Sequence, residues 1–354
     1  MPHISLQDAI DKAGSAVRLL WKPNAPPFRV PVVKPEYAGW REEQAAWSQG
    51  VALSDLSHHM SDLFIEGPDA TRLLGAVSAN DFEAFAFGQA KQFVPVTGEG
   101  HIVTDGILMR EGPHRYVLSG VPAAQSWVQY HAAQGGYDVS LSSDPDSTLR
   151  GGADPMLFRY QIQGSRTPEL IERAFGGPLP KLRFFHSAPA SLAGRTFRVF
   201  RHGMAGQIGY EFIGVWQDGE AVKEALMIAG KAVGLVHVGG LAYATNGIES
   251  GWIPTPTPAI YTAAELQGYR RFLSAHSYEG MKPLHGSFFS ESIEDYYVSP
   301  FELGYGRSIA FNHEFIGRAA LEKSKDQVRR TKVTLAFDAD AVRDIFGANP
   351  GYLL

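Results

Sequence analysis

Residues 92–120 read QFVPVTGEGHIVTDGILMREGPHRYVLSG. Apolar runs of strand length alternate in this stretch with the glycine-containing turns GEG and EGPH. Short apolar runs separated by glycine turns are typical of an antiparallel β-meander. A helix is expected directly after the meander, from Ala123 to Gln134, because apolar residues there recur at helical spacing. The stretch therefore predicts an antiparallel sheet flanked by a helix, which is an α+β arrangement.

The order strand–helix–strand–strand–helix occurs twice along the chain, around residues 61–135 and around residues 156–234. This repetition predicts a duplicated α+β unit. The polar stretch SLSSDPDSTLRGGADP, residues 140–155, is expected to be the linker between the two units. Ser5 and Asp8 predict a capped first helix, and Lys332–Phe337 is expected to form a late strand.

Composition excludes several classes of protein. The chain has 354 residues, a net charge of −5 and no cysteine. The missing cysteines exclude disulfides, thiolate catalysis, cysteine zinc sites and iron–sulfur clusters, and no histidine or carboxylate spacing predicts a metal. The acidic balance argues against a nucleic acid or membrane partner. There is no secretory signal pattern and no apolar run of roughly 18 residues, so we expect a cytoplasmic protein.

Four short motifs follow one another along the chain. They are DLSH at 55–58, RHGMAGQIGYE at 201–211, GIESG at 247–251 and FIGRAAL at 315–321. In this order they resemble the folate-binding superfamily of the glycine-cleavage T-protein, the aminomethyltransferase. The resemblance covers most of the chain and implies duplicated antiparallel α/β units around a central site. It also implies a C-terminal β-domain, which is largely absent from this chain.

The resemblance implies a division into domains. Residues 1–50 with 151–255 are expected to form a discontinuous folate-binding domain, and residues 51–150 a second domain. Residues 256–354 are expected to be a connector, rich in proline and aromatic residues, followed by the start of a C-terminal domain. A long segment of this composition inside a compact protein is often functional.

Further motifs resemble one branch, the tetrahydrofolate-dependent aryl O-demethylases that act on vanillate, syringate and 3-O-methylgallate. They include HHM at 58–60, AKQFVPVT at 90–97, FF at 184–185, PAIY at 258–261 and IEDYY at 293–297. The resemblance implies a methoxylated aromatic substrate and tetrahydrofolate as the methyl acceptor. The aminomethyltransferase has two aspartates where this chain has Asp105 and Gly106, so aminomethyl transfer is disfavoured. Tyr243 stands in place of a family arginine, which suits a neutral ether.

The branch implies two catalytic residues, His59 and Tyr243. An aryl ether loses a phenoxide, and a phenol has a pKa of about 10, so a donor at the ether oxygen helps it to leave. Imidazole titrates near neutral pH, which favours His59 as a proton donor, with Tyr243 as a second donor. The alternatives are a packed strand histidine and a core tyrosine. His58 is expected to point to the opposite face.

The resemblance also implies residues that bind folate. Glu211 is expected to pair with N3–H and the 2-amino group of the pterin, because a carboxylate accepts two parallel hydrogen bonds. A solvated glutamate is the alternative, but the surrounding run GYEFIGV is apolar. Trp252 is a candidate face for a ring of folate or substrate, and Gln163 a further folate contact or a buried turn residue.

The substrate-binding residues depart from the branch. Val30 and Val121 stand where the vanillate-type enzymes have a tyrosine and an arginine, so Arg29 is the candidate cation for a substrate carboxylate. Tyr261 is expected either to line the pocket mouth or to pack in the core. Two other functions stay open: a tetrahydrofolate-dependent demethylase of a sulfonium, an amine or a neutral methoxyphenol, and a folate-binding protein without catalysis.

Overall fold

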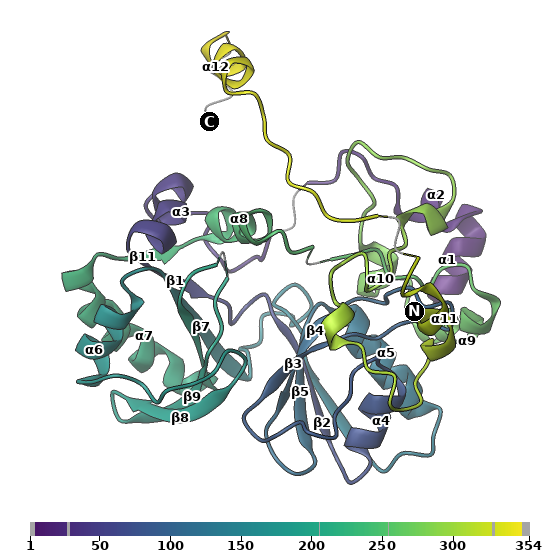
Figure 1. The fold of residues 1–354 in the computed structure, drawn as a ribbon, viewed down its shortest axis with the longest axis horizontal. Helices are drawn as coiled ribbons and strands as arrows, with labels where there is room; N and C mark the ends of the chain where they lie inside the picture. Colours follow the sequence, from purple (N-terminus) through teal and green to yellow (C-terminus); the bar gives the residue numbers. More distant parts are fainter. Residues whose placement is uncertain (1–3, 27–28, 205, 254, 328–329, 349–354) are drawn as a thin grey trace.

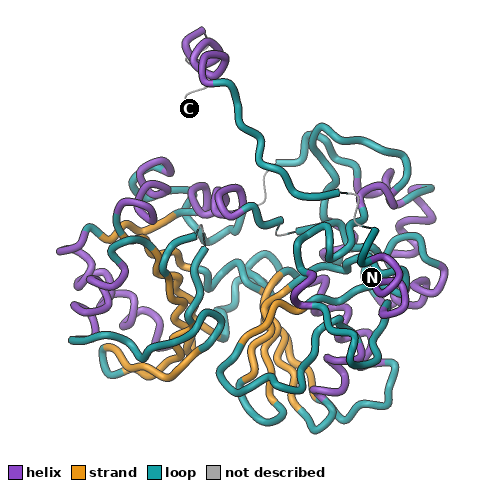
Figure 2. The backbone as a smooth tube through the Cα atoms, viewed as in Figure 1, coloured by secondary structure: helices purple, strands orange, loops and turns teal. Residues whose placement is uncertain are grey.

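The computed structural model describes residues 4–26, 29–204, 206–253, 255–327 and 330–348. Ala205, which belongs to the motif at 201–211, lies outside these residues. The fold is α+β, with two separate sheets side by side, each backed by helices (Figures 1 and 2). None of the described helices is long and apolar enough to cross a membrane.

The larger sheet has the strand order β11-β1-β7-β10-β9-β8. Its strands are β1 (Val51–Asp55), β7 (Leu157–Gln163), β8 (Ser187–Leu192), β9 (Arg195–Phe200), β10 (Gly209–Val215) and β11 (Leu235–Val238). Only the pair β1–β11 is parallel. Helices α6 (Thr167–Phe175) and α7 (Gly219–Gly230) cover one face, where Leu170 and Leu226 pack on Phe158 and Phe212. Burial of these side chains stabilises the layer.

The smaller sheet has the order β3-β4-β5-β2-β6. Its strands are β2 (Ser61–Glu66), β3 (Ala90–Phe93), β4 (Gly106–Arg110), β5 (Arg115–Gly120) and β6 (Ser140–Asp144). Strands β3, β4 and β5 pair in sequence order and antiparallel, which confirms the predicted meander. The following helix is α5 (Pro122–Ala133), and α4 (Ala70–Ala76) lies beside it.

Two helices near the N-terminus complete the core of the smaller sheet. α1 (Leu6–Ala13) begins with the predicted capping box of Ser5 and Asp8, and α2 (Ala16–Leu20) follows. Leu6 and Leu20 share one hydrophobic core with Leu63 and Leu118 of the sheet. Residues 1–50 are therefore divided: α1 and α2 join the smaller sheet, while α3 (Trp40–Gln49) packs on the larger one.

Two boundaries differ from the expected ones because strand pairing overrides composition. Residues 51–55 form β1 inside the larger sheet, so the second domain does not begin there. Residues 140–144, expected in a linker, form the edge strand β6 beside β2. Its serines are exposed, and an edge strand does not require apolar alternation.

The remaining helices connect and cover the two sheets. They are α8 (Gly240–Ser250), α9 (Gln267–Phe272), α10 (Tyr278–Met281), α11 (Arg318–Ser324) and α12 (Ala339–Ala348), with 3₁₀ turns η1 (Trp216–Asp218), η2 (Lys231–Val233), η3 (Ala264–Leu266), η4 (Ile293–Tyr296) and η5 (Gly306–Ser308). The expected strand 332–337 is not formed: these residues run as an extended segment towards α12, which projects from the body (Figure 1).

Candidate active site

The turn that joins β1 to β2 passes from the larger sheet to the smaller one and carries both neighbouring histidines. The Ser57 hydroxyl donates to Asp55 Oδ1 at 2.6 Å and accepts from the backbone N–H of Arg159 at 2.9 Å, which ties the turn to β7. The ring of His59 lies edge-on to the ring of Tyr243 on α8, with centroids 4.6 Å apart. His58 instead contacts Trp216 and Ser147. The two histidine side chains thus point to different places, as expected. They lie in a turn, however, and not in a strand.

His59 is half-buried, and its buried Nε2 has no hydrogen-bond partner among the described residues. Burial lowers the pKa of His59 to about 4, and Asp55 only partly offsets it. The imidazole is therefore neutral near pH 7, and the expectation that it titrates there is corrected. Burial also raises the pKa of Tyr243. The pair offers one neutral N–H and one neutral O–H as hydrogen-bond donors.

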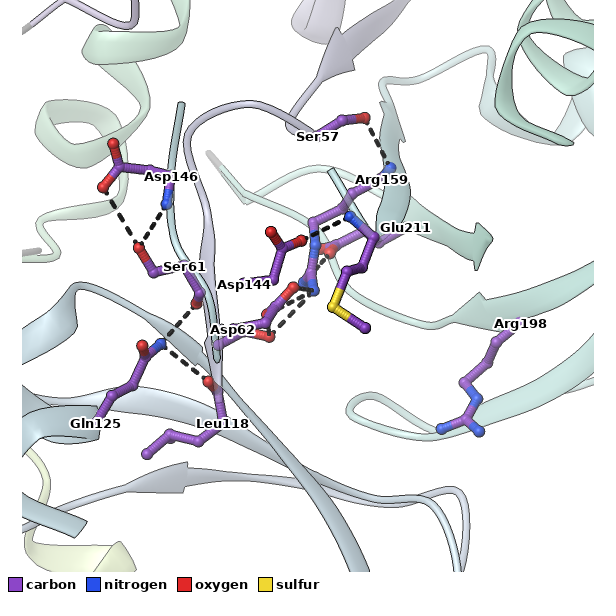
Figure 3. Close-up of polar contacts among 12 residues, drawn as sticks. Ser57, Ser61, Asp62, Leu118, Gln125, Asp144, Asp146, Arg159, Arg198 and Glu211 are labelled. Carbon is purple, nitrogen blue, oxygen red and sulfur yellow. Dashed lines mark hydrogen bonds and ion pairs between the residues drawn. The ribbon is translucent and has the colours of Figure 1, made fainter. Parts of the chain in front are cut away.

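A buried ionic cluster joins the two sheets (Figure 3), and its Arg159 and Glu211 act electrostatically on His59 and Tyr243. Arg159 of β7 lies between two carboxylates: its Nη1 is 2.7 Å from Glu211 Oε1 on β10, and its Nη2 is 3.1 Å from Asp62 Oδ1 on β2. The same Nη2 donates to Ser119 Oγ of β5 at 3.0 Å. One guanidinium therefore holds strands of both sheets. The sequence analysis missed Arg159, although a charged residue inside the apolar run MLFRYQIQG was a usable signal.

Glu211 carries a negative charge in this cluster. Its burial favours the neutral acid, but Arg159 and His202 outweigh that effect and lower the pKa of Glu211 to about 2. His202 Nδ1 lies 3.4 Å from Oε2. A carboxylate has about four lone-pair sites, and these two contacts use two of them. Glu211 therefore keeps the capacity to accept two further hydrogen bonds.

Gln163 lies at the end of β7 and is fully buried. Its Oε1 accepts the backbone N–H of Met204 at 2.9 Å, and its Nε2 donates to Asn246 Oδ1 at 3.2 Å. Gln163 thus holds the loop before Glu211 against helix α8, which carries Tyr243. These contacts support a positioning role, and direct contact with folate stays a prediction.

Trp252 belongs to a second polar cluster, around Asp105. The Asp105 Oδ2 accepts from Tyr305 OH at 2.8 Å, from Trp252 Nε1 at 3.3 Å and from the Gln92 amide. Burial raises the pKa of Asp105 to about 6, against the opposing effect of these donors. The indole is 41% exposed, so one part of its ring is open to a ligand.

Gly106 has no space for a side chain. A Cβ there would lie 2.9 Å from Leu118 Cδ1 and 3.0 Å from the Ser119 carbonyl oxygen in the neighbouring strand. Close strand packing is therefore a second reason for a glycine at this position, and the argument from the missing charge stays a prediction. The carboxylate near Trp252 is that of Asp105.

The expected substrate-binding residues lie apart from these clusters. Arg29 is exposed and Val30 half-buried in the irregular segment before α3, and Val121 precedes α5 as its N-cap. Tyr261 is 3% exposed within the core, and its hydroxyl donates to the Glu279 carbonyl at 2.8 Å. Of the two alternatives for Tyr261, the structure shows the packed one. In the described part of the chain, no hydrogen bond joins these four residues to His59, Tyr243 or Glu211.

The two-sheet fold, with Arg159 paired to carboxylates of both sheets, is accompanied by similarity to a known protein family. The GCVT N-terminal domain family matches residues 24–257, and the chain belongs to this family. It is 42% identical over 334 residues to syringate O-demethylase of Sphingobium sp. (strain NBRC 103272 / SYK-6), covering 94% of this chain and 72% of that protein. It is 29% identical over 316 residues to sesamin methylene transferase of Sinomonas sp. (strain No.22), covering 88% of this chain and 67% of that protein.

A solved structure confirms the fold. The glycine cleavage system aminomethyltransferase T from Bartonella henselae superposes with a TM-score of 0.59 at 20% identity, over 90% of this chain and 73% of that one. The predicted T-protein-like fold is therefore confirmed.

Proposed function

We propose that this protein is an O-demethylase that moves the methyl group of a methoxyarene to N5 of tetrahydrofolate, giving a phenol and 5-methyltetrahydrofolate. The identity with syringate O-demethylase supports the substrate class. The observation that carries the proposal is the His59–Tyr243 pair, in which the buried Nε2 of His59 has no hydrogen-bond partner among the described residues. A buried polar atom without a partner is costly, so its presence favours a binding site.

The described residues fit tetrahydrofolate. Glu211 is ionised and can accept two more hydrogen bonds, which matches the N3–H and 2-amino donors of a pterin. Trp252 offers part of its ring for stacking. When bound, tetrahydrofolate supplies the nucleophilic nitrogen that accepts the methyl group.

The chain's own residues act on the leaving oxygen. His59 and Tyr243 are both neutral, so each contributes a hydrogen bond to the oxygen on which negative charge develops, rather than a full proton transfer. In this site, where both side chains are half-buried, such hydrogen bonds are stronger than in water. The phenoxide takes up one proton from solvent after release, and this balances the proton that the methylated nitrogen gives up to solvent.

The substrate is a methoxylated aromatic compound of the vanillate or syringate kind. Val30 and Val121 provide no charge for a carboxylate, and Arg29 is an exposed cation in the same segment as Val30. Arg29 therefore stays the candidate partner for an acidic substrate.

Mass spectrometry of the folate pool tests the proposal. The protein is incubated under anaerobic conditions with tetrahydrofolate and, separately, with syringate, vanillate, 3-O-methylgallate, guaiacol, a methylenedioxybenzene, a methylsulfonium and a methylated amine. We expect 5-methyltetrahydrofolate and the matching phenol from at least one methoxyarene. Product from only the sulfonium or the amine would establish the alternative donor, and folate binding without product from any compound would establish a non-catalytic protein.

A further inference from the structure

A cavity of about 330 Å³ lies along the free edge of strand β3. Its lining includes Lys91 and Gln92 of β3, Phe185, and Arg307 of the turn η5. The Asn80 amide closes one end by donating to the carbonyl oxygens of Gln92 and Ser308. The volume is at the lower end of ligand pockets, about 300–1,000 Å³, and suits one end of a larger ligand.

The lining carries two cations and one carboxylate. Lys91 Nζ donates to the backbone carbonyl of Asp81, and neither Lys91 nor Arg307 forms an ion pair with a carboxylate in the described part of the chain. The Asp81 carboxylate already accepts from the Glu83 N–H at 2.8 Å and from Asn312 Nδ2 at 3.1 Å. The cavity therefore has a net positive charge: Asp81 acts on Lys91 through space, and Arg307 forms no ion pair in the described part of the chain.

The cavity shares its walls with both halves of the candidate site. The Gln92 side chain reaches Asp105, and Tyr305, in the same loop as Arg307, bonds Asp105 as well. On the other side Phe185 packs against His202 at 5.6 Å between centroids, and His202 contacts Glu211. Phe185 thus lies between the His202–Glu211 contact and the cavity.

We propose that this cavity is a carboxylate subsite that holds the glutamate end of tetrahydrofolate, with Arg307 and Lys91 as its cationic partners. The assignment rests on the proposed function, because it requires folate as the ligand. Folate has a pterin at one end and glutamate carboxylates at the other, and guanidinium pairs with carboxylate through two parallel hydrogen bonds. The second cavity, of about 390 Å³, lacks such a free cation, because its Arg318 is paired with Glu314 and Glu322.

Calorimetry with the variants Arg307→Met and Lys91→Met tests the subsite. Each is titrated anaerobically with tetrahydrofolate, with its triglutamate form, and with tetrahydropteroate, which lacks the glutamate. Arg173→Met, an exposed arginine on α6, is the matched control. We expect either cavity variant to weaken tetrahydrofolate binding about tenfold, as for one lost charge-assisted hydrogen bond, and to leave tetrahydropteroate and the control unchanged.

Three results would overturn the subsite. One is wild-type affinity for tetrahydrofolate in both variants. Another is an equal loss of affinity for tetrahydropteroate, which would show that Arg307 and Lys91 have a structural role. The third is unchanged folate affinity with a raised KM for carboxylated but not for neutral methoxyarenes, which would assign the cavity to the aromatic substrate. Failure of the wild-type protein to bind any of the three pterins would overturn the proposed function itself.

Discussion

The ring of His59 meets the ring of Tyr243 edge-on, at 4.6 Å between centroids and an interplanar angle of 60°. The two residues come from the turn between the sheets and from helix α8, which are far apart in the sequence. Both side chains are neutral because burial lowers the pKa of the histidine and raises that of the tyrosine. Two neutral donors side by side suit stabilisation of a leaving phenoxide.

Removing either donor should slow the chemical step. We expect His59→Ala and Tyr243→Phe to lower kcat about 10²–10³-fold, the usual cost of one lost donor to a developing oxyanion. Folate affinity should hardly change. His58→Ala is the control, because His58 contacts Trp216 and Ser147 instead, and it should act mainly through stability.

The dependence on the leaving group separates this role from a structural one. Phenols with electron-withdrawing substituents leave more easily and need less stabilisation, so the deficit of both variants should shrink as the phenol pKa falls. Steady-state kinetics on a series of substituted methoxyarenes measures this slope. A deficit that is constant across the series would contradict the assignment.

Glu211→Gln should weaken folate binding at least tenfold. The loss of one partner in a buried charged pair costs about 2–5 kcal/mol, and the variant also removes the charge that faces Arg159. Calorimetry gives the affinity, and circular dichroism shows whether the fold persists, since Arg159 keeps Asp62 as a partner. Glu172→Gln, an exposed glutamate on α6, is the control. Unchanged affinity in a folded variant would remove Glu211 from the site.

Buried histidine should make the fold sensitive to acid. Burial lowers the pKa of His131 to about 4, and this side chain packs against Trp127 at 4.3 Å between centroids. The unfolded chain then binds more protons than the folded protein between pH 6.5 and 4. The contribution of His131 to the free energy of unfolding is therefore present above pH 6.5 and is lost as the pH falls through 4. We expect His131→Gln, measured by thermal unfolding, to show a flatter loss of Tm over this range. A Tm profile parallel to that of the wild type would contradict the prediction.

Asp105 should report its titration through Trp252. The carboxylate changes charge near pH 6, and the indole Nε1 donates to it. We expect the fluorescence difference between wild type and Trp252→Phe to titrate with a midpoint near pH 6, and Asp105→Asn to abolish it. Tyr305→Phe removes a hydrogen bond that favours the carboxylate, so it should move the midpoint upwards. A difference signal independent of pH in the wild type would show that the two groups are not coupled.

Raised and lowered pKa values act in opposite directions on stability. Because the folded-state pKa of Asp105 is raised, the contribution of Asp105 to the free energy of unfolding is present below pH 4 and is lost as the pH rises through 6. The His131 variant therefore has to be compared with wild type at each pH rather than across the whole profile.

Elements that depend only on neighbouring residues in the chain could be predicted from the sequence. Alternating apolar runs and glycine turns between 92 and 120 predicted the meander, and the Ser5–Asp8 pair predicted a helix start, because these signals act over a few residues. The ordered motifs predicted the family. They also predicted that His59 and Tyr243 work together, which the ring contact supports without testing their roles.

The sheet that each segment joins and the ion pairs between charged side chains became known only from the folded structure. Leu6 and Leu20 could be buried against either sheet by their apolarity alone, and the structure places them in the smaller one. KVTLAF, residues 332–337, has strand-like alternation, but a strand needs a hydrogen-bonded neighbour, and Phe337 remains 79% exposed. The contacts of Arg159 with Asp62 and Glu211 depend on strands that meet only after folding, because ionic interactions act through distances in space and not along the chain.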